Sequence, residues 1–132
     1  MGQLGREANV VLKQAPGLGF NAFSFNTTRA PFDNIKVRQA FTTAIDKQAI
    51  LRAVYFGTGA IASGGIPPSM GWAHDTSFAP YKPSVDAAKK LLAEAGVTAP
   101  VPVTITVTNS PVQVRTAEVL QAQANAAGFK VE

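Results

Sequence analysis

Residues 103–132 read VTITVTNSPVQVRTAEVLQAQANAAGFKVE, and the order of elements in this stretch decides the fold class. Residues 103–108 alternate Val, Ile and Val with three threonines, which is the period-2 pattern of a strand with one buried face. The segment SPVQ, from Ser110 to Gln113, matches a capping box with proline at the first helical position. The stretch therefore predicts a strand that leads directly into a helix.

The predicted helix runs to Ala127, where Gly128 stops it and Phe129 can make the apolar contact expected after a glycine stop. Its expected inward side chains are Val112, Thr116, Val119, Leu120 and Gln123. Residues 130–132 begin a second extended segment, and a strand, a helix and a strand in this order form a parallel crossover unit. Because the second strand is barely begun, we expect the natural chain to continue; a frayed C-terminus is the alternative.

Residues 84–96 predict another amphipathic helix, capped by Ser84 and stopped by Gly96. Its expected buried side chains are Val85, Ala88, Leu91, Leu92 and Ala95. Before it, residues 58–83 hold four glycines and four prolines, which predicts a long irregular stretch. We expect Trp72 and Tyr81 to anchor this stretch.

Two more helices are predicted within residues 33–57. Asp33 or Asn34 caps the first, and Asp46 restarts the chain as the cap of the second, which ends at Gly57. Their expected inward side chains are Val37, Ala40, Phe41, Ala44 and Ile45 for the first and Ala49, Ile50, Ala53 and Val54 for the second.

The N-terminal part predicts short extended segments. Residues 9–13 are a strand candidate, residues 14–19 a loop, and residues 21–27 a strand with Phe23 and Phe25 on one side. A turn around Pro31 follows at residues 29–34.

Composition limits the function classes. The 132 residues are 46% hydrophobic, which predicts one globular domain. The 12 Lys and Arg exceed the 8 Asp and Glu but form no dense cationic run, so we expect no nucleic-acid partner. There is no cysteine, no apolar run of the length of a membrane span, and no signal peptide at Met1.

No catalytic set can be assembled from the sequence. His74 is the single histidine, and beside Asp75 it gives two candidate ligands, which do not make a metal site. The glycines do not match a phosphate-binding loop, and no serine lies in a nucleophile elbow. We therefore expect no enzyme activity, no metal and no cofactor.

A series of short motifs, in order, resembles a known family. These motifs are Phe25-Asn26, PFDN at 31–34, VRQA at 37–40, AIDK at 44–47, PP at 67–68 and LLAEAG at 91–96. Together they resemble the second, C-terminal lobe of the family 5 extracytoplasmic solute-binding proteins, the peptide-, dipeptide- and nickel-binding subunits of ABC importers.

The resemblance implies an α/β fold, a periplasmic-binding-protein-like lobe with a small mixed sheet flanked by three to four helices. Residues 1–20 would be a lead-in and residues 21–132 the core of a partial lobe. The whole protein would close two lobes over a peptide or similar small solute and deliver it to the membrane permease subunits. It would work in the periplasm, or on a lipid anchor in a single-membrane bacterium.

The resemblance also suggests where ligand would lie, near residues 23–26 and 64–72. Phe23, Asn26 and Trp72 are the candidate ligand-binding residues, because aromatic rings and amides suit a peptide. Each has a structural alternative: Phe23 in the core, Asn26 capping a turn, and Trp72 anchoring the loop. For Arg38 we favour a structural partner, a carboxylate or carbonyl.

A different interpretation is a structural or interaction module. An unfinished crossover strand leaves an unpaired sheet edge, through which two copies could form a homodimer.

Overall fold

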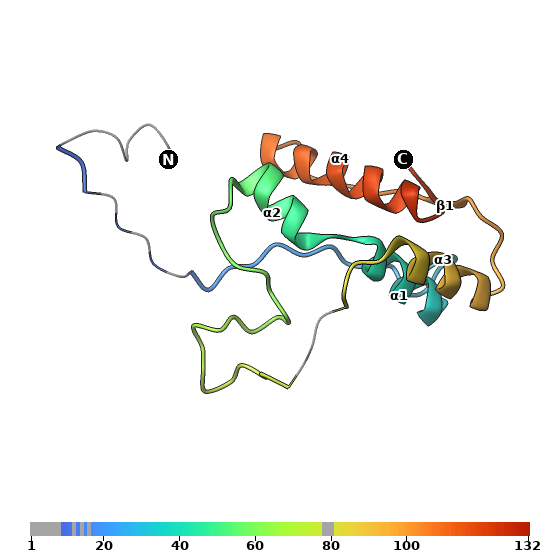
Figure 1. Ribbon diagram of the computed structural model, residues 1–132, viewed down its shortest axis with the longest axis horizontal. Helices are drawn as coiled ribbons and strands as arrows, with labels where there is room; N and C mark the ends of the chain where they lie inside the picture. Colours follow the sequence, from blue (N-terminus) through green and yellow to red (C-terminus); the bar gives the residue numbers. More distant parts are fainter. Residues whose placement is uncertain (1–8, 12, 14, 16, 78–80) are drawn as a thin grey trace.

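The computed structural model describes residues 9–11, 13, 15, 17–77 and 81–132. Over these residues the chain forms four helices and two strands, listed here in chain order: α1 (Ile35–Ala44), α2 (Lys47–Tyr55), α3 (Val85–Glu94), β1 (Val101–Val103), α4 (Pro111–Ala126) and β2 (Phe129–Val131). Figure 1 shows α2 beside α4, with α1 and α3 together at the other side of the core. The expected α/β class is confirmed.

The C-terminal crossover unit is present as predicted. β1 and β2 pair in parallel, with Val101 opposite Phe129 and Val103 opposite Val131, and α4 connects them. The Ser110 hydroxyl accepts a hydrogen bond from the Gln113 N–H at 3.3 Å, which caps α4 behind Pro111. The described sheet is therefore two parallel strands joined by one helix.

The first strand is shorter and starts earlier than its sequence pattern predicts. Residues 103–108 were expected as the strand, but β1 is Val101–Val103 and only Val103 is common to both. The last ladder bond runs from the Ile105 N–H to the Glu132 carbonyl at 2.9 Å, and no described residue pairs with residues 106–108 as a strand. An alternating hydrophobic pattern indicates a segment that can form a β-strand. How many of its residues do so also depends on how many residues of the partner strand lie beside it.

The strands predicted nearer the N-terminus are not found. No strand is formed over residues 21–27, nor over the described residues of 9–13, residue 12 being outside the description. The same-side placement of Phe23 and Phe25 is nevertheless correct, since their rings pack edge to face with centroids 5.2 Å apart. The predicted turn at residues 29–34 is present.

The predicted helix caps are confirmed. The side chains of Asn34, Asp46 and Ser84 each accept a backbone N–H from the first turn of the helix that follows, at 2.9, 3.0 and 3.2 Å. α2 ends at Tyr55, and its C-cap, Phe56, takes a left-handed conformation at φ 52°.

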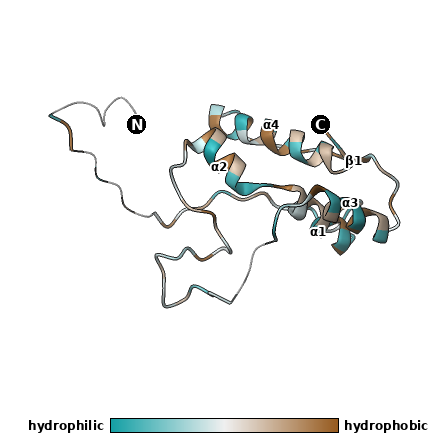
Figure 2. Ribbon diagram, viewed as in Figure 1, coloured by the Kyte–Doolittle hydropathy of each residue, from teal (hydrophilic) through white to brown (hydrophobic). Residues whose placement is uncertain are grey.

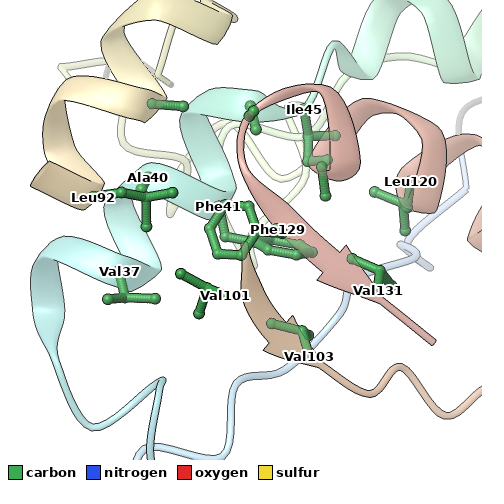
Figure 3. Close-up of a cluster of buried hydrophobic side chains, with 14 residues drawn as sticks. Val37, Ala40, Phe41, Ile45, Leu92, Val101, Val103, Leu120, Phe129 and Val131 are labelled. Carbon is green, nitrogen blue, oxygen red and sulfur yellow. The ribbon is translucent and has the colours of Figure 1, made fainter. Parts of the chain in front are cut away.

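A single hydrophobic core lies between the helices and the sheet (Figure 3). Phe41 on α1 is 2% exposed and packs edge to face on Phe129 of β2, with ring centroids 5.1 Å apart. All five side chains expected to point inward from the first helix are buried: Val37, Ala40, Phe41, Ala44 and Ile45.

For the other helices, the residues that are buried match the predicted inward faces only in part. Val85 and Val112, near the starts of α3 and α4, are 38% and 45% exposed, and Ala53 of α2 is also exposed. Ala124 is fully buried in α4 although the pattern did not single it out. In Figure 2 hydrophilic and hydrophobic residues alternate along α4, in keeping with a helix that is covered on one side only.

Two polar contacts join α1 to the end of α3. The Asn34 side-chain amide donates to the Ala95 carbonyl at 3.4 Å, and Lys36 Nζ donates to Glu94 Oε2 at 2.8 Å. The Lys36–Glu94 pair is about two-fifths exposed on both sides. Hydrogen bonding to Lys36, and then its charge, lower the pKa of the Glu94 carboxyl.

This ion pair predicts a small pH dependence of stability. Because the pKa of Glu94 is lower in the folded state than in the unfolded state, its contribution is present above the ordinary glutamate pKa of about 4.3 and is lost as the pH falls through the folded-state pKa. Urea unfolding at pH 7 and pH 3 should show a smaller loss of stability on acidification for Lys36→Met than for the wild type. An identical loss in both proteins would contradict this role for the pair.

A glutamine on α4 holds the junction of α1 and α2. Gln123 Oε1 accepts a hydrogen bond from the Asp46 N–H at 2.9 Å, and Gln123 Nε2 donates one to the Asp46 carbonyl at 3.4 Å. Both bonds are partly buried, so a lost partner leaves backbone groups unsatisfied.

We expect Gln123→Ala to lower the free energy of unfolding by about 1–3 kcal/mol, the range for leaving such groups unpaired. Urea denaturation monitored by circular dichroism would measure the change. Gln48→Ala is the matched control, because Gln48 is exposed on α2 and makes no side-chain hydrogen bond that the structure describes. Equal effects of the two substitutions would show that the junction is held by other contacts.

Among the described residues, no helix has the length and apolarity needed to cross a membrane.

Candidate ligand-binding surface

The candidate residue Phe23 lies at the border between core and surface. Its ring packs edge to face on Phe41, with centroids 5.4 Å apart, yet 38% of the residue is exposed. Phe25, two residues on, turns into the same cluster and packs on Phe32 at 4.7 Å. Phe23 therefore contacts the core through Phe41 but is not itself buried in it, and part of the residue is exposed to solvent.

Asn26 caps a turn. Its Oδ1 accepts from the Thr28 N–H at 3.1 Å and from the Thr28 hydroxyl at 2.8 Å. These bonds hold the carbonyl oxygen of the side chain, and the residue as a whole is exposed. The turn-capping alternative is thus present in the structure.

Trp72 does not anchor the loop between α2 and α3, contrary to expectation. It is 86% exposed, and Tyr81, the other expected anchor, is 47% exposed. Polar contacts within the loop hold it instead: His74 Nδ1 lies 2.7 Å from the Ile66 carbonyl, and the Ala73 and His74 N–H groups donate to the Met70 carbonyl. The described part of the loop extends away from the helices and the sheet (Figure 1), in keeping with the exposure of Trp72.

The structure does not gather the three candidate residues into one pocket. No contact that it describes joins Trp72 to Phe23 or Asn26. The N-terminal segment and the loop do approach each other next to Phe20, since a Cβ placed on Gly65 would lie 3.9 Å from the tip of the Phe20 ring. Phe20 and Gly65 are thus the point at which the two candidate segments, residues 20–26 and 64–72, come near each other, and the two segments are called the candidate surface.

A polar cluster next to Phe23 was missed by the sequence interpretation. Asn21 Nδ2 donates to the Tyr55 hydroxyl at 3.1 Å, and Gln113 Nε2 donates to Asn21 Oδ1 at 3.3 Å. All three side chains reach solvent at least in part. They come from the N-terminal segment, the end of α2 and the first turn of α4.

The place of Gln113 in the fold gives a signal that could have revealed this cluster. In α/β sheets, ligands bind outside the carboxyl ends of the strands, where crossover helices begin. Gln113 is the third residue of α4, which follows the carboxyl end of β1. The sequence interpretation gave Gln113 only the reciprocal role in the capping box, but its amide reaches Asn21 instead.

Arg38 is held by the backbone of the turn that precedes α1. Arg38 on α1 donates to the Phe32 carbonyl at 2.6 Å and to the Asp33 carbonyl at 3.1 Å, which confirms the structural partner expected for it. The described residues include no group of three or more His, Cys, Asp or Glu that could hold a metal ion.

Two hollows in the described structure contain none of the candidate residues Phe23, Asn26 and Trp72. The larger, about 440 Å³, is lined by Ala44, Asp46, Pro83, Ser84, Val85, Ala122, Gln123 and Ala126. The smaller, about 170 Å³, is lined by Ile105, Val107, Val114, Ala117, Glu118, Gln121, Val131 and Glu132.

Known sequences related to this chain are solute-binding proteins. The chain is 44% identical over 90 residues to heme-binding protein A of Haemophilus influenzae, and 40% identical over 92 residues to the dipeptide-binding protein of Escherichia coli. The alignments cover 68% and 70% of this chain but 16% and 17% of the two relatives. The chain thus matches about a sixth of the length of these relatives.

Solved structures give the same result over the whole chain. A dipeptide binding protein from a Pseudoalteromonas species in complex with Met-Leu matches all of this chain with a TM-score of 0.82 and 31% identity. An ABC transporter-associated periplasmic binding protein from Helicobacter pylori, in complex with the peptide STSA, matches 99% of it with a TM-score of 0.87 and 29% identity. The matched parts are 27% and 25% of those two chains.

A family model agrees with both comparisons. The model described as bacterial extracellular solute-binding proteins, family 5 Middle, matches residues 2–132. This chain belongs to family 5 of the bacterial extracellular solute-binding proteins.

Proposed function

We propose that this chain forms part of one lobe of a protein that captures a peptide-like solute outside the cytoplasmic membrane and delivers it to the permease subunits of an ABC importer. Residues 1–20 are the lead-in and residues 21–132 the core of this partial lobe. The protein binds and releases its solute without catalysing a reaction. It works in the periplasm, or on a lipid anchor at the outer face of a single-membrane bacterium.

The observation that carries this proposal is the likeness to two proteins solved with peptides bound. They share 31% and 29% of their residues with this chain, at TM-scores of 0.82 and 0.87. The likeness extends over 100% and 99% of the chain, so it includes the candidate surface and not the core alone.

The chemistry of the candidate surface suits a peptide. Peptide main chains offer alternating N–H and C=O groups, which side-chain amides can satisfy in both directions. Asn21, Asn26 and Gln113 supply three amides on the exposed side of the core. Phe23 and Trp72 supply exposed aromatic surface, and a second lobe closing over it would bury apolar ligand atoms.

A chimera tests the proposal in a complete protein. The segment of the Escherichia coli dipeptide-binding protein that matches this chain would be replaced by this chain, and binding of Met-Leu would be measured by calorimetry. We expect the chimera to bind the dipeptide with a Kd within about tenfold of the parent, or ~1.4 kcal/mol. A chimera that folds, as judged by circular dichroism, but does not bind at about 1 mM peptide would overturn the proposal.

Two substitutions in the chimera test the site residues. We expect Trp72→Ala and Asn26→Ala to weaken dipeptide binding by about tenfold each, the scale of a truncated anchor. Phe56→Ala is the matched control, because Phe56 is an aromatic residue that is 91% exposed at the end of α2, outside the candidate surface. Unchanged affinity in both site variants would remove these residues from the site and leave the proposed function standing.

A further inference from the structure

The outer edge of β2 carries backbone groups that β1 does not use. The Val101 N–H donates to the Gly128 carbonyl, the Glu132 N–H donates to the Val103 carbonyl, and the Glu132 carbonyl accepts from the Ile105 N–H. Successive residues of a strand in a parallel pair direct their backbone groups to opposite edges. Val131, one residue before Glu132, therefore directs its N–H and its carbonyl away from β1.

Both of these groups on Val131 are occupied by side chains of α4. The Val131 N–H donates to Asn125 Oδ1 at 2.8 Å, and Gln121 Nε2 donates to the Val131 carbonyl at 2.7 Å. Gln121 and Asn125 are four residues apart, so they lie on the same side of α4, one turn from each other. The two amides together reproduce the donor and the acceptor that a further strand would present.

We propose that Gln121 and Asn125 form an edge guard, an amide pair that closes the outer edge of β2 against a strand from a second copy of this chain. An unpaired strand edge is a template for association, and proteins protect such edges by covering or occupying them. Val131 is the last residue of β2, and both of its backbone groups at the outer edge are taken by the amide pair. A homodimer through this edge must first break both bonds of the edge guard.

Single-cysteine crosslinking tests the edge directly, because the chain has no cysteine of its own. Lys130→Cys places a thiol on the exposed central residue of β2. We expect little disulfide-linked dimer from Lys130→Cys alone under mild oxidation. When Gln121→Ala and Asn125→Ala are added, we expect the fraction of disulfide-linked dimer to rise at least about fivefold. This is the ratio expected when one hydrogen bond no longer has to be broken for the strands to associate.

The matched control background is Gln48→Ala with Asn109→Ala, which removes two exposed amides that make no side-chain hydrogen bond the structure describes. This background should leave the crosslinked fraction unchanged. Equal crosslinking with and without the edge guard, in folded proteins, would overturn the proposal, and so would abundant crosslinking of Lys130→Cys with the edge guard intact.

If the double variant is poorly folded, amide hydrogen exchange in a single variant tests whether the edge guard holds the Val131 N–H. Exchange at Val131 in the single variant Asn125→Ala should be about fivefold faster than in the wild type, with exchange at core amides such as Phe41 unchanged. Equal rates at Val131 would overturn the proposal, because Asn125 would then not hold the N–H of the strand edge.

Discussion

Phe41→Ala is expected to lower the free energy of unfolding by about 3–5 kcal/mol, the range for truncating a buried phenylalanine. Phe41 is 2% exposed, and its ring packs edge to face on Phe25 at 5.8 Å, on Phe32 at 5.7 Å and on Phe129 at 5.1 Å. The substitution removes the side chain that joins α1, β2 and the N-terminal segment. Because domains of this size are stable by only about 5–15 kcal/mol, much of the fold's stability would be lost.

Urea denaturation followed by circular dichroism would measure this change. Phe56→Ala is the control, since the same atoms are removed from a side chain that is 91% exposed. Its expected effect is within about 0.5 kcal/mol. A loss below about 1 kcal/mol for Phe41→Ala would mean that the aromatic cluster is not the centre of the core.

Gly128→Ala is expected to destabilise the protein by about 1–3 kcal/mol, the cost of holding a residue with a Cβ in a sparsely populated backbone region. Gly128 takes φ +100° between α4 and β2, beyond the left-handed region that other residues occasionally adopt. A Cβ there would also meet Leu92 Cδ1 at 3.4 Å and Ala99 Cβ at 3.5 Å. These are ordinary van der Waals distances, so the expected cost comes from the backbone conformation and not from a clash.

Two further glycines make the measurement a graded series. Gly96 takes φ +71° after α3 with no atom near its Cβ position, so Gly96→Ala should cost about 1 kcal/mol. Gly19→Ala, at a position without positive φ and with nothing within 4 Å, should be neutral within about 0.5 kcal/mol. Thermal or urea unfolding of the three variants would give the order, and an effect at Gly128 no larger than at Gly19 would contradict the argument.

Only part of the candidate surface could be predicted from the sequence. Asn26 and Phe23 could be named because an amide and an aromatic ring lie at the end of an apolar segment. Their role in the fold depends on Thr28, which donates two hydrogen bonds to Asn26, and on Phe41, which packs against Phe23. The cluster of Asn21, Tyr55 and Gln113 could not be seen, because Gln113 lies 92 residues from Asn21 and also fitted a local capping role.

The exposure of Trp72 was decided by where its loop runs. A large aromatic residue in a glycine- and proline-rich loop usually covers a core, and the sequence offered nothing against that expectation. The loop instead closes on itself through Met70 and His74 and leaves the ring 86% exposed. The family was predicted from ordered motifs within residues 21–132, most of which prove to be caps and buried helix faces, and the family model matches residues 2–132.

The sequence alone determined the helices, their caps and the strand–helix–strand order at the C-terminus. Asn34, Asp46, Ser84 and Ser110 act within one turn of chain, and hydrophobic periodicity acts within one element, so neither needs a distant partner. Only the tertiary structure decided how far β1 extends, which amides of α4 hold Asp46 and Val131, and which aromatic rings stay exposed. These features depend on contacts between residues that are far apart in the chain, such as Gln123 and Asp46, which are 77 residues apart. Local sequence patterns do not predict such contacts.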